Sequence, residues 1–240
     1  MKTPEISVVV PVYNECRRLP EALAQVARAP FTKEVIVVDD ASPAGTRQWL
    51  KKFESGRARV ANLPREAGRV AYHARNQGKG AALRTGFALA RGRFIVIQDA
   101  DLEYDPADWP QLLAPLQAGR ADVVYGTRLA GGGAHRVHLF WHSLGNGFLT
   151  LVSNMCTNLN LTDMETGSKA FRRDLVRRFR IKSNRFGIEP ELTAKFARLG
   201  CRIYEVPVSY HGRTYAQGKK ITWRDGLAAF WHIVRFRLLD

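Results

Sequence analysis

Phe94-Ile95-Val96-Ile97-Gln98-Asp99-Ala100-Asp101 is a short apolar run that ends in two carboxylates separated by one residue. An apolar run without polar alternation predicts a buried strand over residues 93–98, because a strand covered on both faces has no solvent side. The two carboxylates then stand at the end of that strand. Paired carboxylates suit a hard cation such as Mg²⁺ or Mn²⁺, which in turn binds phosphate oxygens. Asp pairs also occur at turns and helix starts, so the surrounding sequence has to decide between these interpretations.

The rest of the chain alternates short apolar runs with helical patterns. This rhythm predicts an α/β fold with a Rossmann-like, mainly parallel central sheet and helices on both faces. The predicted strands are 6–12, 34–39, 59–63, 93–98, 122–125 and 201–210. The strand at 59–63 is the weaker one, and a loop rich in Arg and Gly follows it. The predicted helices are 19–29, 45–53, 80–90, one or two within 138–161, and an amphipathic helix at 223–239.

Polar residues follow three of these strands, as Asn14-Glu15, Asp39-Asp40 and the Asp99–Asp101 triplet. Open parallel sheets bind ligands at the carboxyl ends of their strands, so we expect a cleft there. Helix capping accounts for one member of the Asp39-Asp40 pair. The other, Asp40, is assigned to a ribose hydroxyl or a base N–H of a nucleotide. Beside that base and ribose we place three residues of the first strand end: Pro11, Tyr13 and Glu15.

Cationic side chains for phosphate groups are found in three places. Lys79 lies between two glycines, but the spacing of a nucleotide-triphosphatase phosphate loop is absent, as is the glycine-rich dinucleotide fingerprint after the first strand. These absences disfavour an ATPase, an NAD enzyme and a nucleotidyltransferase. Arg128 follows a strand, and Arg213 and Lys219 lie in a polar segment. Each is suited to clamp a phosphate, with a solvated surface as the alternative.

The overall charge also favours anionic partners. The chain has 37 Lys and Arg against 22 Asp and Glu, a net charge of +15, and a pI near 10.2. A nucleic-acid-binding module is one explanation. We disfavour it, and expect no nucleic-acid partner, because carboxylates stand at the strand ends and the basic residues do not accompany a base-stacking motif.

Several features bear on location. The three cysteines are widely spaced and suggest a reducing cytosol, and the N-terminal residues do not resemble a signal peptide. Charged or polar residues interrupt every apolar run, so membrane contact is expected to be peripheral, at the cytoplasmic face. The Trp, Phe and Arg residues of 223–240 suit an interfacial helix, with packing on the core as the alternative.

The Gly131–Gly133 run is either a mobile loop over the site or a plain linker.

Five motifs are spread along the chain: Val10-Pro11-Val12-Tyr13-Asn14-Glu15, Val38-Asp39-Asp40-Ala41-Ser42, Gln98-Asp99-Ala100-Asp101-Leu102-Glu103, Gly126-Thr127-Arg128 and Thr162-Asp163-Met164-Glu165-Thr166-Gly167-Ser168-Lys169. Together they resemble family 2 GT-A glycosyltransferases, in the branch that contains dolichol-phosphate mannosyltransferases and polyprenyl-phosphate glycosyltransferases. The resemblance covers nearly the whole chain.

The resemblance implies a GT-A fold and a role for each matching residue. A single catalytic domain is expected, with residues 1–128 as the nucleotide-sugar half, 129–220 as the acceptor half and 221–240 as a C-terminal helix. The implied catalytic residues are Asp99, Asp101 and Arg128. The implied nucleoside contacts are Pro11, Tyr13, Glu15, Val38 and Asp40. The implied diphosphate and metal contacts are Asp99, Ala100 and Asp101, and Glu103 is a further metal contact at a position where relatives often carry Gln. The implied phosphate contacts are Lys79, Arg128, Arg213 and Lys219.

The reaction implied is transfer of a hexose from GDP-mannose or UDP-glucose to a polyprenyl or dolichyl phosphate, with inversion and with Mg²⁺ or Mn²⁺. A phosphate anion is already a nucleophile and needs no dedicated base. Two departures stand out: residues 135–143 lack an Arg-x-x-x-Ser arrangement, and Met164-Glu165 replaces smaller residues. Glu165 as a base would suit a hydroxyl acceptor on a glycan, glycolipid or cell-wall polymer, which is the alternative function.

Overall fold

A single sheet organises the chain in the computed structural model, which describes residues 4–129, 137, 139–185, 187–212 and 223–239. Its strand order is β3-β2-β1-β4-β6-β5-β7, and β6 runs antiparallel to both neighbours while the other adjacent pairs are parallel. The mainly parallel sheet predicted from the sequence is confirmed. The strands are β1 (Ile6–Val12), β2 (Lys33–Asp39), β3 (Gly68–Tyr72), β4 (Phe94–Ile97), β5 (Val123–Thr127), β6 (Lys169–Arg172) and β7 (Ile203–Pro207).

The middle residues of the central strands are apolar because both faces of these strands are covered. Val8 of β1 lies opposite Val35 of β2 on one side and Val96 of β4 on the other, and all three have no exposed surface. Their neighbours Val9 and Ile36 point to the opposite face and are equally buried. Side chains on either face of these strand centres therefore lose their contact with water, which explains the unbroken Val and Ile runs.

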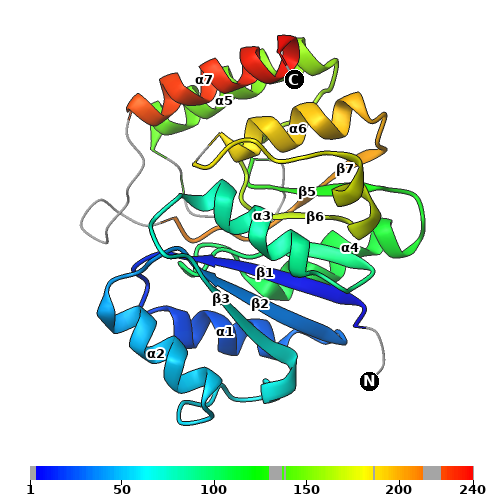
Figure 1. Ribbon diagram of the computed structural model, residues 1–240. Helices are drawn as coiled ribbons and strands as arrows, with labels where there is room; N and C mark the ends of the chain where they lie inside the picture. The colour runs from blue at the N-terminus through cyan, green and yellow to red at the C-terminus, as the bar shows by residue number, and fades with distance from the viewer. Residues whose placement is uncertain (1–3, 130–136, 138, 186, 213–222, 240) are drawn as a thin grey trace.

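Two groups of helices cover the sheet (Figure 1). One face packs against α1 (Leu19–Arg28), α2 (Ala44–Glu54) and α4 (Trp109–Gln117). The other face packs against α3 (Lys79–Leu89) and α6 (Ile188–Arg198). The predicted α/β architecture with helices on both faces is confirmed.

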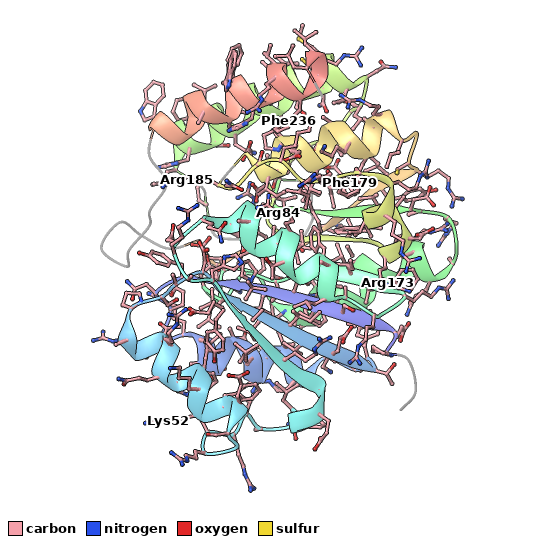
Figure 2. The ribbon with its side chains drawn as sticks, viewed as in Figure 1. Lys52, Arg84, Arg173, Phe179, Arg185 and Phe236 are labelled. Atoms are coloured by element: carbon pink, nitrogen blue, oxygen red, sulfur yellow. The ribbon has the colours of Figure 1, made fainter. Side chains whose placement is uncertain are left out.

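Two further helices, α5 (Phe140–Thr157) and α7 (Trp223–Leu238), pack against α6 and against each other beyond the second face (Figure 1). Segment 138–161 thus contains one helix among its described residues. Ile233 and Phe236 of α7 are buried, and Figure 2 shows Phe236 on the side of the helix that faces α6. Phe230 and Trp231 remain exposed. The apolar residues of the C-terminal helix therefore divide between the core and the surface.

The expected strand at residues 59–63 is wrong, and the strand lies farther on, in β3, where the sequence suggested a loop. Asn62 has a left-handed φ of 61°, which turns the chain before Pro64. β3 is an edge strand whose five residues are all partly exposed, so it lacks the apolar run that marks the central strands. The Gly131–Gly133 segment lies outside the described residues. Among the described helices, none is both long enough and apolar enough to cross a bilayer.

Candidate active site

The Asp99–Asp101 triplet directly follows β4, at the carboxyl end of the sheet's central region. Ala100 is buried and anchors the triplet. Asp101 is partly exposed, and its Oδ1 accepts a hydrogen bond from the Glu103 N–H at 3.2 Å. Leu102 has a φ of 66°, so the chain reverses tightly after the triplet. The turn keeps the Asp101 carboxylate at the sheet edge rather than in the core.

Asp99 forms a partly buried charge cluster with two distant residues. The Lys79 ammonium, on the first residue of α3, lies 2.9 Å from Asp99 Oδ2 and 3.1 Å from Oε1 of Glu189, in the first turn of α6. Burial acts to lower the pKa of Lys79, but the charges of Asp99 and Glu189 raise it above its usual value. Lys79 is therefore a fixed cation beside the triplet, and Glu189 is a site residue that the sequence did not single out.

Gly167 is required where it stands because the chain passes directly over this cluster. A Cβ at Gly167 would lie 2.6 Å from Asp99 Oδ2 and 3.1 Å from Cε2 of Tyr104. Tyr104 is itself held, since its hydroxyl accepts a hydrogen bond from the Gly167 N–H at 2.9 Å. Neither neighbour can move away without disturbing the site.

We therefore expect Gly167→Ala to displace the Asp99 carboxylate and to lower the rate of the sugar transfer that the sequence resemblance implies by about 100-fold, the cost of a misplacement near 1 Å. Initial rates with labelled donor measure this effect. Gly145→Ala is the matched control, because a Cβ at Gly145 meets nothing within 4 Å. A Gly167→Ala enzyme as active as the control would contradict the expected steric conflict.

The predicted metal ligands supply only oxygen. Asp99 and Asp101 flank Ala100, while Glu103 Oε2 accepts a hydrogen bond from the Tyr210 hydroxyl at 2.9 Å. Within the described residues, no group of three or more His, Cys, Asp or Glu side chains converges as a ready-made metal site. Such a sparse, hard donor set fits Mg²⁺ or Mn²⁺, which commonly take one or two carboxylates and complete their shell with phosphate oxygens and water.

The predicted nucleoside contacts lie along the ends of β1 and β2. Tyr13 is 44% exposed, Pro11 is partly exposed, and Glu15 is buried and forms an ion pair with Arg18 at 3.1 Å. Val38 is fully buried within β2. Tyr13 is the member of this group with the most surface open to a ligand.

Asp40, at the end of β2, organises the loop that follows β3. Its carboxylate accepts hydrogen bonds from the backbone N–H groups of Gln77 and Gly78 at 2.9 and 2.6 Å, and its Oδ1 lies 2.7 Å from Nδ1 of His73. Asp40 therefore fixes the residues that precede Lys79. A contact from Asp40 to a nucleoside stays a prediction.

Arg128, at the end of β5, forms a bidentate pair with a buried carboxylate. Its Nε lies 2.6 Å from Asp163 Oδ2 and its NH2 2.7 Å from Oδ1, and Asp163 has no exposed surface. Burial acts to raise the pKa of Asp163, but the hydrogen bonds and charge of Arg128 hold it below its usual value. Asn146 of α5 donates to the same carboxylate at 3.1 Å, and the Tyr210 ring lies 5.1 Å from the Arg128 guanidinium carbon. Asp163 belongs to the last quoted motif, which is the signal that marks it in the sequence.

Glu165 and Lys169 place two ionisable groups in the interior behind this motif. Within the described part of the chain, Glu165 Oε1 is buried and has no hydrogen-bond partner. Burial, together with the negative charge of Glu189, raises the pKa of Glu165 from its usual 4.5 to about 8. Lys169 is almost fully buried and donates to the carbonyl oxygens of Met164 and Thr166. Its burial lowers the pKa of Lys169 to about 8.

The raised pKa of Glu165 has a measurable effect on stability. Between about pH 5 and 8 the unfolded chain releases this proton while the folded chain keeps it, so the contribution of Glu165 to the free energy of unfolding falls as the pH rises. We expect Glu165→Gln to gain stability relative to the wild type across this range, by about 1 kcal/mol or more at pH 8. Urea titrations at pH 5, 6.5 and 8 measure the difference. A difference that does not change with pH would contradict the proton assignment.

Arg213 and Lys219, the two remaining predicted phosphate contacts, lie outside the described residues. The other predicted residues fall into three groups on the carboxyl side of the sheet. These are the nucleoside edge, the carboxylates with Lys79, and the Arg128 pair, and the side chain of Tyr210 contacts both Glu103 and Arg128.

The fold that carries this site is similar to that of solved glycosyltransferase structures. The fold is similar to the crystal structure of glucosyl-3-phosphoglycerate synthase from Mycobacterium tuberculosis in complex with Mn²⁺, UDP and phosphoglyceric acid, with a TM-score of 0.70, 20% identity and coverage of 98% of this chain and 78% of that one. The GT-A fold expected from the sequence is confirmed.

Sequence relatives and a family model agree. Undecaprenyl-phosphate mannosyltransferase from Micrococcus luteus is 32% identical over 97% of this chain and 98% of its own length. Dodecaprenyl-phosphate galacturonate synthase from Rhizobium johnstonii is 28% identical over 90% of this chain and 61% of its own length. The model of "Glycosyl transferase family 2" matches residues 7–180. The predicted resemblance is confirmed: the chain is a glycosyltransferase and belongs to family 2.

Proposed function

We propose that this enzyme transfers a hexose from a nucleotide sugar, GDP-mannose or UDP-glucose, to a polyprenyl or dolichyl phosphate, with inversion and with Mg²⁺ or Mn²⁺. The main support for this proposal is that the side chain of Tyr210 contacts both the carboxylate group of the site and Arg128. This side chain donates to Glu103 beside the Asp101 carboxylate and stacks on the Arg128 guanidinium. Carboxylates for a cation and a guanidinium for a second anion are thus one side chain apart. The names of the Micrococcus and Rhizobium relatives support the acceptor class.

Each group of residues has a role in this reaction. Tyr13 and its neighbours at the end of β1 hold the nucleoside. Asp99 and Asp101 hold the divalent cation, which neutralises the diphosphate when bound; the M. tuberculosis structure with Mn²⁺ and UDP supports such a cation. Arg128, together with Arg213 and Lys219, orients the phosphates and offsets the repulsion between two anions. Lys79 adds a fixed positive charge beside Asp99.

The state of Glu165 favours a phosphate acceptor over a hydroxyl acceptor. A hydroxyl acceptor needs a base that is deprotonated near pH 7. Burial raises the pKa of Glu165 above its usual 4.5, which favours the protonated carboxyl over the carboxylate that a base requires. A polyprenyl phosphate is anionic without help from a base and can attack the anomeric carbon directly.

Incubation with radiolabelled GDP-mannose or UDP-glucose, polyprenyl phosphate and Mn²⁺ tests the proposal. Label is expected in the organic phase, and only when the divalent metal is present. Transfer of label to a water-soluble glycan, with none to polyprenyl phosphate, would replace the proposal with the hydroxyl-acceptor alternative. Absence of transfer from every donor would remove the lipid-phosphate assignment.

The exposed surface of α5 supports peripheral contact with a membrane, which we propose to be at the cytoplasmic face. α5 has no Asp, Glu, Lys or Arg, and one exposed stripe of it contains only apolar side chains. On another side of the same helix, Asn146 contacts Asp163 and Arg128. A helix that lies on the bilayer would bring the Arg128 site near lipid phosphates. The exposed residues of the stripe are Trp141, Leu144, Phe148, Leu151 and Met155, and exposed Arg235 and Arg237 on the adjoining α7 suit anionic headgroups.

A flotation assay with vesicles that contain anionic phospholipid tests this contact. We expect Trp141→Ser with Phe148→Ser to reduce the bound fraction by about 10-fold or more, because each side chain contributes a few kcal/mol of apolar burial. Tyr204→Ser, at an exposed aromatic residue of β7, is the control and should leave binding unchanged. Equal binding of the double variant and the control would contradict the assignment of α5.

A further inference from the structure

The position of Glu189 has a consequence for the metal end of the site. Lys79 lies between two carboxylates, Asp99 at 2.9 Å and Glu189 at 3.1 Å. Asp99 follows β4, Lys79 begins α3, and Glu189 stands in the first turn of α6. Side-chain exposure is 20% for Asp99 but 9% for Glu189. Of the two carboxylates, Asp99 is thus the more open to a ligand, and Glu189 lies on its inner side.

Lys79 cannot easily move away from this position. A Cβ at Gly78 would lie 2.4 Å from the Asn184 carbonyl oxygen, and one at Gly80 would lie 2.4 Å from that of Ser183, so the start of α3 packs tightly on the segment before α6. The Ala81 N–H donates to the Asn184 carbonyl at 3.1 Å. Arg84, labelled between α3 and this segment in Figure 2, donates to the Ile181 carbonyl at 3.2 Å. The backbones that carry Lys79 and Glu189 are therefore fixed relative to each other.

This arrangement bears on how Asp99 becomes available to a cation. In the structure, Oδ2 of Asp99 is paired with the Lys79 ammonium. To bind a divalent cation with that oxygen, Asp99 must give up part of the pair, and a largely buried ammonium such as that of Lys79, whose side chain is 16% exposed, is destabilised without a partner. Glu189 offers Lys79 a second carboxylate without any movement. Lys79 and a divalent cation compete for the Asp99 carboxylate. The negative charge of Glu189 weakens this competition, because it gives Lys79 another partner.

We propose that Glu189 is a positioning residue that retains Lys79, so that Asp99 is free to bind the divalent cation. The inference rests on the proposed metal-dependent transfer and adds a residue that acts through Lys79 rather than through substrate. It predicts that the charge of Glu189, and not only its shape, sets the affinity of the site for the metal.

Mn²⁺ titrations followed by electron paramagnetic resonance, with and without saturating UDP or GDP, test the proposal on the purified full chain. Glu189→Gln keeps the shape and removes the charge, and we expect it to weaken Mn²⁺ binding by about 10-fold or more, as loss of an outer partner of a metal ligand does. Glu191→Gln is the matched control on α6, because Glu191 accepts from the backbone of Lys182 and Ser183 and pairs with Lys195 rather than Lys79. The control is expected to change stability and to leave Mn²⁺ affinity within about 2-fold of the wild type.

The double variant Lys79→Met with Glu189→Gln separates positioning from a general structural role. Removing the competing ammonium is expected to restore most of the Mn²⁺ affinity that Glu189→Gln loses, since the two effects act through the same contact. Unchanged Mn²⁺ affinity in Glu189→Gln, or no recovery in the double variant, would overturn the inference while leaving the proposed function standing. A wild-type chain that binds Mn²⁺ neither with nor without nucleotide would overturn both.

Discussion

Asp101→Ala is expected to abolish metal-dependent sugar transfer, with a loss of about 1,000-fold or more, and to leave the fold intact. Asp101 is partly exposed, and its Oδ1 accepts a hydrogen bond from the backbone N–H of Glu103 at 3.2 Å. Its removal therefore costs the core little, whereas the cation that we propose for this site would lose one of its two carboxylates. Initial transfer rates across a Mn²⁺ series, with thermal unfolding alongside, measure both halves of the expectation.

Asp105→Ala provides the matched control for that experiment. Asp105 lies in the same loop and, like Asp101, accepts one backbone N–H two residues on, from Ala107 at 2.9 Å. We expect its loss to cost about 1 kcal/mol of stability and to leave transfer close to the wild-type rate. Transfer by Asp101→Ala within a few-fold of this control would remove the proposed role of the triplet.

The apolar pattern predicted the central part of the fold because each strand there is buried on two faces. β1 was located with its observed bounds, and β2 and β4 within a residue at each end. β3 was misplaced, since an edge strand needs no apolar run. β6 has only four residues and pairs antiparallel between β4 and β5, and nothing in such a short segment signals that pairing. The local hydrophobic pattern of a segment predicts whether the segment is buried, whereas the strand with which it pairs depends on the fold of the whole chain.

The candidate site divides in the same way. The types of its residues were visible in the sequence, because strand ends in a parallel sheet collect ligand-binding side chains. Their partners were not. The sequence predicts a phosphate contact for Lys79 but does not indicate its two carboxylate partners, Asp99 and Glu189, which are 20 and 110 residues farther along the chain. Ion pairs between residues so far apart in the chain depend on the tertiary fold, and residue spacing in the sequence does not predict them.

Asp163→Ala is expected to cause the largest loss of stability, about 3–5 kcal/mol in the free energy of unfolding, because it leaves the Arg128 guanidinium without its bidentate partner. Urea unfolding at pH 7 measures the loss. The folded pKa of Asp163 is lowered below its usual 3.8, so the stabilisation by Asp163 is present above that pH and disappears as the pH falls through the folded pKa. Glu21→Ala is the control, since both members of the Glu21–Arg28 pair are more than half exposed, and it should cost less than about 1 kcal/mol.

A double variant, Arg128→Met with Asp163→Leu, separates the structural part of this pair from its part in the reaction. Apolar side chains of similar size can replace a buried ion pair at little cost, so we expect most of the stability lost in Asp163→Ala to return. Transfer should not return, because the guanidinium that we propose as the contact of the acceptor phosphate would be missing. Recovery of both stability and transfer would show that the pair is only a structural element. Recovery of stability alone would assign Arg128 to the phosphate, since the fold would then be intact and the charge would be the difference that remains.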